Sequence, residues 1–482
     1  MAYHEPITAL NERHLAKPGM TLHQISDLVS GVTENKAPRG WWILFILAAS
    51  MTGMLGAVVG YLAWTGIGIW GNNAPVGWAW DITNFVWWIG IGHAGTLISA
   101  ILFLFRQYWR TAINRFAEAM TIFAVICALL FPTIHTGRPW HIYYPLPIPN
   151  GMNMWPNFKS PLLWDVFAVS TYLTISVTFF MVGLIPDLAA MRDEATGLRK
   201  LIYRGLSFGW NNSYQQWLHY SRGYLLLAAF ATPLVFSVHS IVSWDFAMSL
   251  IPGWHTTIFA PYFVAGAIFS GLAMVITITV PLRAVFGLEK YITNHVLQSM
   301  ARVILFTSVI VGYAYGIEFF IAYYSGVPFE RALFYFRPFG EPGSLAPFKE
   351  AGAFGFPQIA FFLMVFCNVI APIPLWRYKI RTNAVALFFI SILINIGMWF
   401  ERFNIVVSSL QRDFNPANWG SYWPTPVEFG ITLGSFGMFF TLFTLFVRAM
   451  PSIAIAEVKE GSQPPMKFES GHREFASERL ED

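Results

Sequence analysis

The sequence predicts an all-α protein that is embedded in a membrane and crosses it about ten times. Of its 482 residues, 55% are hydrophobic and only 12% are charged, whereas a typical soluble domain has about 25% charged residues. Aromatic residues make up 17% of the chain, which suits the belts that aromatic side chains form at membrane interfaces. Apolar runs recur along the chain, each close to the ~20 residues that a helix needs to cross the hydrocarbon core.

We expect each of ten apolar runs to form one membrane-spanning helix. They cover approximately residues 41–66, 82–105, 116–136, 162–186, 222–243, 258–282, 303–324, 356–376, 383–403 and 428–448. Runs two to five faintly resemble runs six to nine, which predicts two four-helix bundles with the first and tenth helices flanking them. The predicted regions are a tail over 1–40, a membrane domain over 41–450 and a second tail over 451–482.

The loops on one side of the membrane hold most of the basic residues. Loops that follow the even-numbered runs carry residues such as Arg192, Arg199, Lys200 and Arg204, and the loops that follow the odd-numbered runs carry fewer. Because cytoplasmic loops are enriched in Lys and Arg, we expect both tails to be cytoplasmic. The N-terminal segment lacks the apolar run and cleavage site of a secretory signal, so we interpret it as a mature polar tail.

The sequence holds few groups that bind redox cofactors. Its two cysteines, Cys127 and Cys367, both lie inside apolar runs and match neither a c-type haem motif nor a four-thiolate cluster site. A b-type haem needs two histidines at matching depth, and His135 with His239 is the one such pair, although carboxylates share their depth. We therefore predict no haem, iron–sulfur cluster or metal in this chain.

Several ionisable residues are expected inside the membrane or at its outer boundary. Each costs at least about 2.5 to 3.5 kcal/mol at the bilayer centre, so such residues are candidates for function. When the runs alternate in direction, four helices bring one group of them to the outer boundary. That group is His135, Asp165, His239, Asp245, Glu401 and Arg402. In the alternative interpretation, these side chains extend into water from the ends of the helices and have no further role. This fits the long side chain of Arg402 better than the short one of Asp165.

This combination of residues suits the oxidation of a quinol. The reaction removes two protons with two electrons, so it needs bases beside the hydroxyl groups and an apolar slot for the ring. Histidine titrates near neutral pH and a neighbouring carboxylate can accept the second proton. We predict His135 and Asp165 as the catalytic pair. The residues predicted to bind the quinol are Asp245, Arg402, His239 and Trp164.

A further set of ionisable residues forms a candidate proton path. Its predicted members are His93, Glu118, Glu318 and Glu401. The alternative for these residues is structural: helix-to-helix hydrogen bonds and packing satisfy them without any movement of protons.

Two segments resemble a known family of membrane proteins. IHTGRP at 134–139 and SPLLWD at 160–165 resemble the corresponding segments of the NrfD/PsrC family, whose members handle quinones beside periplasmic iron–sulfur proteins. The ten-span layout is similar to that of the quinol-binding NrfD-like subunit of alternative complex III, a bacterial quinol:cytochrome c (or oxidase) oxidoreductase. Simpler members of the family have eight spans, so runs one and ten depart from that core.

The resemblance implies a specific role in the bacterial inner (cytoplasmic) membrane. The chain would bind no redox cofactor of its own. It would oxidise menaquinol near the periplasmic face and release protons there, and proton translocation would be an addition to this reaction. Electrons would pass to a periplasmic iron–sulfur subunit, to multihaem cytochrome c subunits and to a terminal oxidase. A second NrfD-like membrane subunit is a further implied partner, and nucleic acid is not expected.

Two other classes of function remain open from the sequence. The faint repeat and the buried ionisable groups are also compatible with a secondary transporter, although transporters place their sites near the midplane. The outer loops over 137–161 and 325–355 are rich in proline and aromatic residues, which is compatible with a purely structural anchor of a respiratory complex.

Overall fold

The computed structural model of the protein describes residues 30–290, 292–340, 355–462, 467–469 and 472–474. Within these ranges, ten helices are long and apolar enough to cross a membrane. Each of them overlaps one predicted run, so the prediction of an all-α integral membrane protein with ten spans is confirmed. Most of the predicted tail over 1–40 and parts of the tail over 451–482 and of the outer loop over 325–355 lie outside the described residues.

The spanning helices are connected by loops and by shorter helices. In chain order they are α3 (Arg39–Thr65), α4 (Trp80–Thr96) continued by the π-helical turn η2 (Leu97–Ile101) and α5 (Leu102–Leu104), α6 (Asn114–His135), α7 (Pro161–Glu194), α9 (Tyr214–Ala247), α10 (Phe259–Val285), α11 (Asn294–Tyr324), α13 (Phe356–Val365) continued by η7 (Phe366–Ile370) and η8 (Ile373–Trp376), α15 (Ala384–Phe403) continued by η9 (Asn404–Ser408), and α16 (Pro426–Ala449).

The shorter elements lie outside these spans. They are α8 (Gly197–Leu206), α12 (Pro328–Phe339), α14 (Tyr378–Arg381), α17 (Ile455–Ser462) and the 3-10 turns Ile67–Ile69, Tyr108–Ala112, Pro139–His141, Leu288–Lys290 and Pro416–Asn418. Two short strands, β1 (Lys467–Glu469) and β2 (His472–Glu474), pair in antiparallel register near the C-terminus, a small departure from the all-α prediction.

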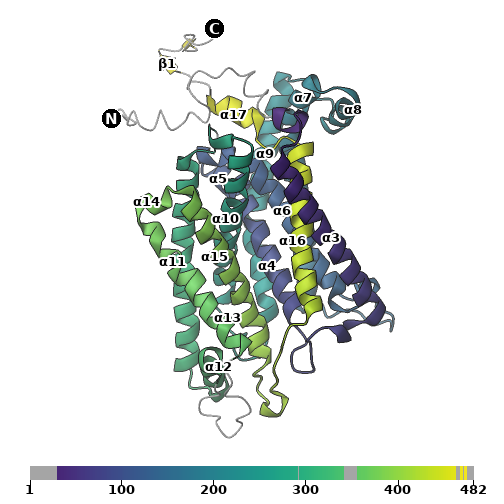
Figure 1. The fold of residues 1–482 in the computed structure, drawn as a ribbon, viewed down its shortest axis with the longest axis vertical. Helices are drawn as coiled ribbons and strands as arrows, with labels where there is room; N and C mark the ends of the chain where they lie inside the picture. Colours follow the sequence, from purple (N-terminus) through teal and green to yellow (C-terminus); the bar gives the residue numbers. More distant parts are fainter. Residues whose placement is uncertain (1–29, 291, 341–354, 463–466, 470–471, 475–482) are drawn as a thin grey trace.

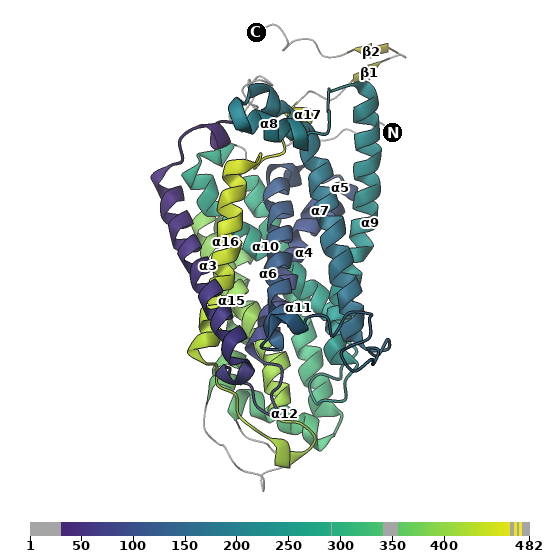
Figure 2. The same cartoon turned by 90° about the vertical axis from the view of Figure 1, so that its right-hand side faces the viewer.

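The long helices run side by side along the long axis of the molecule (Figure 1). α8 and α17 lie at one end of this axis and α12 lies at the other (Figures 1 and 2). We call these the α17 end and the α12 end. Since successive spans alternate in direction, α6 and α9 finish at the α12 end, and α4 and α7 begin there.

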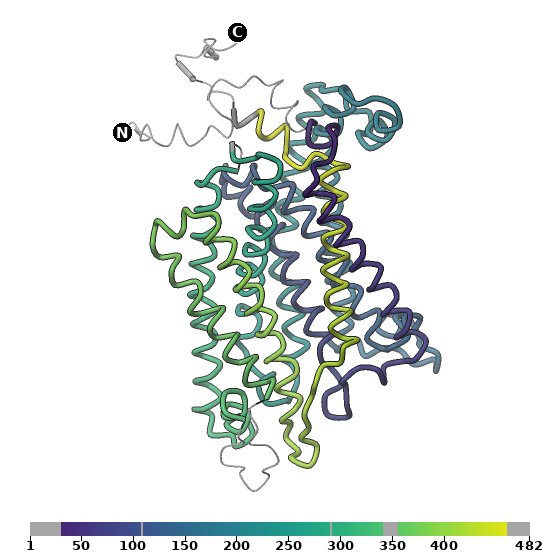
Figure 3. Tube along the Cα trace, viewed as in Figure 1, coloured from purple at the N-terminus to yellow at the C-terminus, as the bar shows by residue number. Residues whose placement is uncertain are grey.

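Eight of the ten helices form the two bundles that the repeat predicted. α4, α6, α7 and α9 pack together in one, and α10, α11, α13 and α15 pack together in the other. α4 and α10 join the bundles. They are the most enclosed spans, because 94% and 83% of the residues in their apolar 18-residue stretches are buried. α3 pairs with α16 at one side of the molecule (Figure 3), and only 11% of its apolar window is buried, so most of its surface is available to lipid.

Small residues allow α4 to approach its neighbours closely. A methyl group at Gly95 would collide with the side chain of Thr121 and the backbone of Ala117 on α6. On the other side, a methyl group at Gly271 of α10 would collide with Ala94. Close backbone contact at small residues is the usual basis of helix packing in membranes. It positions the polar side chains of α4 between both bundles.

The segment IHTGRP forms a tight turn at the end of α6. Gly137 follows the helix with a φ of 74°, a conformation that L side chains rarely adopt. A Cβ at this position would also lie 2.6 Å from the backbone nitrogen of Ile67. The turn therefore requires glycine, and it fixes His135 as the last residue of the helix.

Candidate functional site

His135 forms its ion pair with an aspartate that was not among the predicted site residues. Its Nδ1 lies 2.5 Å from Oδ2 of Asp81, which is in the first turn of α4. The Asp81 side chain is 3% exposed and that of His135 is 26% exposed. His135 therefore forms its ion pair with Asp81 rather than with Asp165, and the role of His135 and Asp165 as a catalytic pair stays a prediction. Asp81 was missed because it lies one residue before the apolar run that begins at 82.

Asp165 pairs instead with Asp245, across the interface between α7 and α9. Their side chains share a hydrogen bond. Because an ionised carboxylate has no hydrogen to donate, this bond requires a proton on one of the two groups. Oδ1 of each residue is buried without a hydrogen-bond partner among the described residues. The pair can therefore exchange a proton with a ligand that reaches it.

The two tryptophans that precede these aspartates in the chain contact each other. The rings of Trp164 and Trp244 meet edge to face with centroids 6.0 Å apart, and Nε1 of Trp164 donates to the carbonyl of Phe158 at 2.9 Å. The predicted neighbours Trp164, Asp165 and Asp245 thus do lie together at the α12 end.

A cavity of about 190 Å³ opens beside Asp245. It is lined by Trp78, Ser160, Pro161, Leu162, Trp244, Asp245, Met248 and Ser249. Ligand sites for drug-sized molecules span roughly 300 to 1,000 Å³. This cavity is therefore of a size for a ring or head group, while a long apolar tail would lie outside it, along the helices.

His239 lies deeper than the carboxyl pair and packs against His93. The two rings meet edge to face with centroids 4.3 Å apart, and both side chains are fully buried. His93 Nδ1 is 2.7 Å from the carbonyl of Ile89 and its Nε2 is 3.1 Å from the carbonyl of Val235. Carbonyl groups only accept hydrogen bonds, so both contacts are satisfied together only when the ring carries two protons.

The ring nitrogens of His239 have no partner among the described residues. His239, which the sequence placed among the quinol-binding residues, thus lies beside His93 and not beside the acid pair.

Arg402 and Glu401 form a buried group in the second bundle. Arg402 is 2% exposed, so the interpretation that its side chain reaches water at the helix end is wrong. Its Nη1 lies 3.0 Å from Oε1 of Glu401, and its guanidinium lies 4.0 Å from the ring centre of Phe263. The Tyr315 hydroxyl donates to Glu401. The Phe263 ring also packs against His239, with centroids 6.1 Å apart, and so separates Arg402 from the histidine pair.

Glu318 is paired with an arginine that the sequence placed in an outer loop. Arg337 of α12 donates from Nη1 to Oε1 of Glu318 at 2.6 Å, and both side chains are more than nine-tenths buried. Arg337 is enclosed because α12 folds back under the second bundle. That helix has no long apolar run, so the sequence pattern did not predict it.

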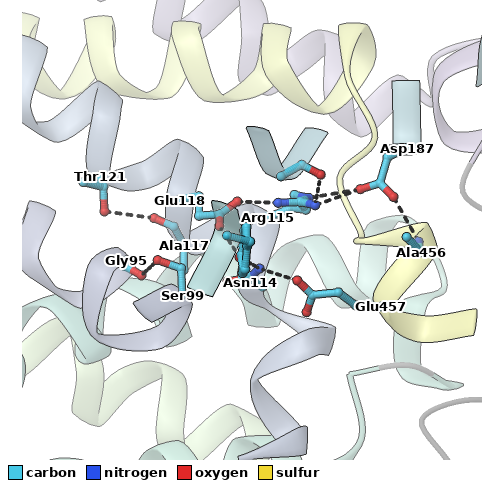
Figure 4. A network of polar contacts seen from close by, with 12 residues as sticks. Gly95, Ser99, Asn114, Arg115, Ala117, Glu118, Thr121, Asp187, Ala456 and Glu457 are labelled. Atoms are coloured by element: carbon cyan, nitrogen blue, oxygen red, sulfur yellow. Dashed lines mark hydrogen bonds and ion pairs between the residues drawn. The ribbon is translucent and has the colours of Figure 1, made fainter. Parts of the chain in front are cut away.

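Glu118 lies in a network of ion pairs towards the α17 end, shown in Figure 4. Arg115 donates to Glu118 at 2.7 Å and to Asp187 of α7 at 3.0 Å. Asp187 also accepts from the backbone nitrogen of Ala456 at 2.9 Å, and Glu457 of α17 lies 3.1 Å from Arg110. Each of the three carboxylates in this network lies against an arginine, and Arg115 serves two of them. This favours the structural alternative for Glu118, because the network fixes α17 against α6 and α7.

Comparison with known proteins is consistent with this architecture. Residues 68–412 match the model of the family described as polysulphide reductase, NrfD. The chain is 27% identical over 251 residues to a putative membrane subunit of dimethyl sulfoxide reductase from Halobacterium salinarum, covering 50% of this chain and 51% of the relative. It is 24% identical over 272 residues to a selenate reductase subunit from Mesobacillus selenatarsenatis, covering 55% and 61% respectively. The chain therefore matches only part of the length of each relative.

Proposed function

Because its family model spans residues 68–412, the chain belongs to the NrfD polysulphide reductase family, and we propose that it is the quinone-binding membrane subunit of a respiratory oxidoreductase. In this proposal it oxidises menaquinol at the α12 end. The electrons pass to an iron–sulfur subunit docked there and onward to multihaem cytochrome c subunits and a terminal oxidase. A second NrfD-like subunit shares the complex, as in alternative complex III.

The Asp165 and Asp245 pair is the observation that carries this proposal. It is a largely buried pair of carboxyl groups that share a hydrogen bond, have oxygen atoms without a partner among the described residues and lie beside a cavity lined by tryptophan rings. A quinol hydroxyl can donate a hydrogen bond to the free carboxylate oxygen. When two electrons leave for the partner's redox centre, the ring becomes a quinone and both hydroxyl protons are released, the first of them to this pair.

We assign the exit of protons to His135. This residue ends α6 at the same end of the molecule as the acid pair, and about a quarter of its side chain is exposed. Its hydrogen bond to Asp81 holds one ring nitrogen, which leaves the other able to accept a proton and pass it to water.

In our proposal the α12 end faces the periplasm and the α17 end faces the cytoplasm. The support is the distribution of charge: the segment between α7 and α9 at the α17 end carries Arg199, Lys200 and Arg204 on α8. Cytoplasmic segments next to spans are enriched in such residues. With this orientation, protons from the quinol leave to the periplasm.

Substitution of the acid pair tests the function. We expect Asp165→Asn, and separately Asp245→Asn, to lower kcat/KM for a soluble menaquinol analogue at least about 100-fold in the purified complex, because each removes a proton acceptor next to the reacting hydroxyl. Asp193→Asn is the matched control, since Asp193 also lies on α7 but is 68% exposed, and it should leave turnover unchanged.

Assembly of the complex is verified by recovery of the partner subunits with each variant. Wild-type turnover in both acid-pair variants would overturn the assigned role. If the unmodified chain also fails to bind menaquinone in equilibrium dialysis, the chain acts as a structural anchor.

A further inference from the structure

A second, larger cavity lies in the other bundle, also at the α12 end. Its volume is about 390 Å³, and it is enclosed by the last turns of α11, by α12, by α13 and by the loop before α10. Its apolar walls include Phe319, Phe334, Phe361 and Leu333. This volume lies within the range of typical small-molecule sites, and nothing in the proposed quinol oxidation at Asp165 and Asp245 uses it.

One side of this cavity is polar and incompletely satisfied. Arg337 lines it, and although Nη1 and Nη2 of Arg337 are bonded, its Nε has no partner among the described residues. The same holds for the hydroxyl oxygen of Thr256, another lining residue. A buried polar group without a hydrogen bond costs about 1 to 3 kcal/mol. A ligand with oxygen atoms that accept hydrogen bonds would remove this cost at both positions.

The charges around the cavity disfavour an anionic ligand. Glu318 already neutralises Arg337 at 2.6 Å. Glu330 adds a second carboxyl group, and the backbone nitrogen of Gly253 donates to it at 3.1 Å. A phosphate head group would therefore meet an arginine that is already paired, two carboxyl groups and the exposed ring of His255, which carries a charge only when it is protonated. The head group that fits is neutral.

The shape of the cavity favours a flat ring with an apolar tail. The ring of Phe319 packs against those of Phe361 and Phe334 with centroids 5.6 and 6.3 Å apart, which leaves aromatic faces and edges along one wall. Ile321 and Phe339 also line the cavity and are 43% and 61% exposed. The cavity therefore reaches the outer surface of the bundle, where a tail can enter the lipid.

We propose that this cavity is a second binding site for a quinone-class molecule, separate from the site at Asp165 and Asp245. A ring carbonyl accepts from Arg337 or Thr256, and in the reduced form a ring hydroxyl donates to Glu318. The chain then binds two quinone-class molecules, one in each bundle. The second site does not depend on the proposed function, because it lies in the other bundle and shares no residue with the first.

Photolabelling of the purified full-length chain in lipid nanodiscs tests this site. The probe is an azido derivative of 2-methyl-1,4-naphthoquinone, and labelled peptides are mapped by mass spectrometry. We expect the unmodified chain to be labelled both within 318–339 and within 244–249. Ala322→Phe fills the cavity and should abolish the first label while keeping the second. Thr256→Val removes one donor with little change in volume and should weaken the first label about 5- to 10-fold.

The matched control is Ala229→Phe, the same substitution at an exposed position on α9, and it should leave both labels unchanged. Absence of label within 318–339 in the unmodified chain would overturn the proposal, as would its persistence in Ala322→Phe. Native mass spectrometry provides a third contrary outcome, namely a phospholipid that copurifies with the unmodified chain and not with Ala322→Phe. Asp165→Asn should lower kcat/KM in the purified complex at least about 100-fold without affecting the label within 318–339, so failures of the two proposals are distinguishable.

Discussion

Three buried or partly buried aspartates at the α12 end each follow a tryptophan. They are the pairs Trp80 with Asp81, Trp164 with Asp165, and Trp244 with Asp245. Tryptophan prefers the membrane interface, so it holds the adjacent short carboxyl group at that depth. This repeated dipeptide is the signal in the sequence that would have identified Asp81.

The sequence was sufficient to predict the depth of the site residues but not their partners. Span boundaries place Asp81, His135, Asp165 and Asp245 at one end of the molecule. Which of them touch depends on the rotation of each helix about its axis, and packing sets that rotation at contacts such as Gly95 against Ala117. A single sequence contains no record of those contacts.

At the same scale, Glu330 makes stability depend on pH. It lies on α12, outside the spanning helices, and burial raises the pKa of its carboxyl group above the ordinary value of 4.5, with partial offset from the Gly253 hydrogen bond. The folded protein therefore binds this proton more tightly than the unfolded chain does. The resulting stabilisation is complete below pH 4.5 and is lost as pH rises through the folded pKa.

We therefore expect Glu330→Gln to raise the Tm relative to the unmodified chain by an amount that grows between pH 4.5 and neutral pH. Tryptophan fluorescence during thermal unfolding in detergent measures this difference at each pH. A difference that stays constant or shrinks over this interval would contradict the assignment.

At the scale of elements, apolar runs predicted the spanning helices and missed the elements outside the hydrocarbon region. α7 ends at Glu194 instead of 186, and α9 begins at Tyr214 instead of 222. A helix satisfies its own backbone hydrogen bonds and continues into water without an apolar run. α8, α12 and α17 are short and carry charged residues. They contain no long apolar run, so the sequence pattern did not predict them.

The packing of α4 gives a prediction at this scale. Gly95→Ala places a methyl group against Thr121 and the backbone of Ala117, and such overpacking costs about 1 to 3 kcal/mol. We expect a lower Tm and a lower yield of folded protein. Gly56→Ala is the control, because Gly56 on α3 has open space at the same position and alanine favours the helix. Equal Tm values for the two variants would show that α4 and α6 can move apart without loss of folding stability.

At the scale of the whole molecule, buried polar groups occur at successive depths along the long axis. The Arg115 network lies towards the α17 end, the His93 and His239 pair lies deeper within the bundle, and the acid pair lies at the α12 end. The Arg115 network fixes α17, whereas the histidine pair and the acid pair are compatible with proton movement through the bundle, which we propose as an addition to quinol oxidation.

The histidine pair tests this addition. We expect His93→Gln and His239→Gln to preserve quinol oxidation and to reduce the number of protons moved per electron when the complex is reconstituted in liposomes with a pH-sensitive dye inside. Both residues are fully buried between α4 and α9, whereas His219 on α9 is exposed, so His219→Gln should change neither quantity. An unchanged proton count in both variants would limit proton release to the quinol site itself.

The arrangement of buried charges also has a consequence for synthesis of the chain in the membrane. Arg115 and Glu118 are three residues apart on α6, and Glu401 and Arg402 are adjacent on α15. Each helix thus carries its own counter-charge when it enters the bilayer, where an isolated charge costs at least about 2.5 to 3.5 kcal/mol. α6 and α15 can therefore each partition into lipid before a later helix is inserted. Asp187 on α7 can form its ion pair with Arg115 once α6 and α7 have both been inserted.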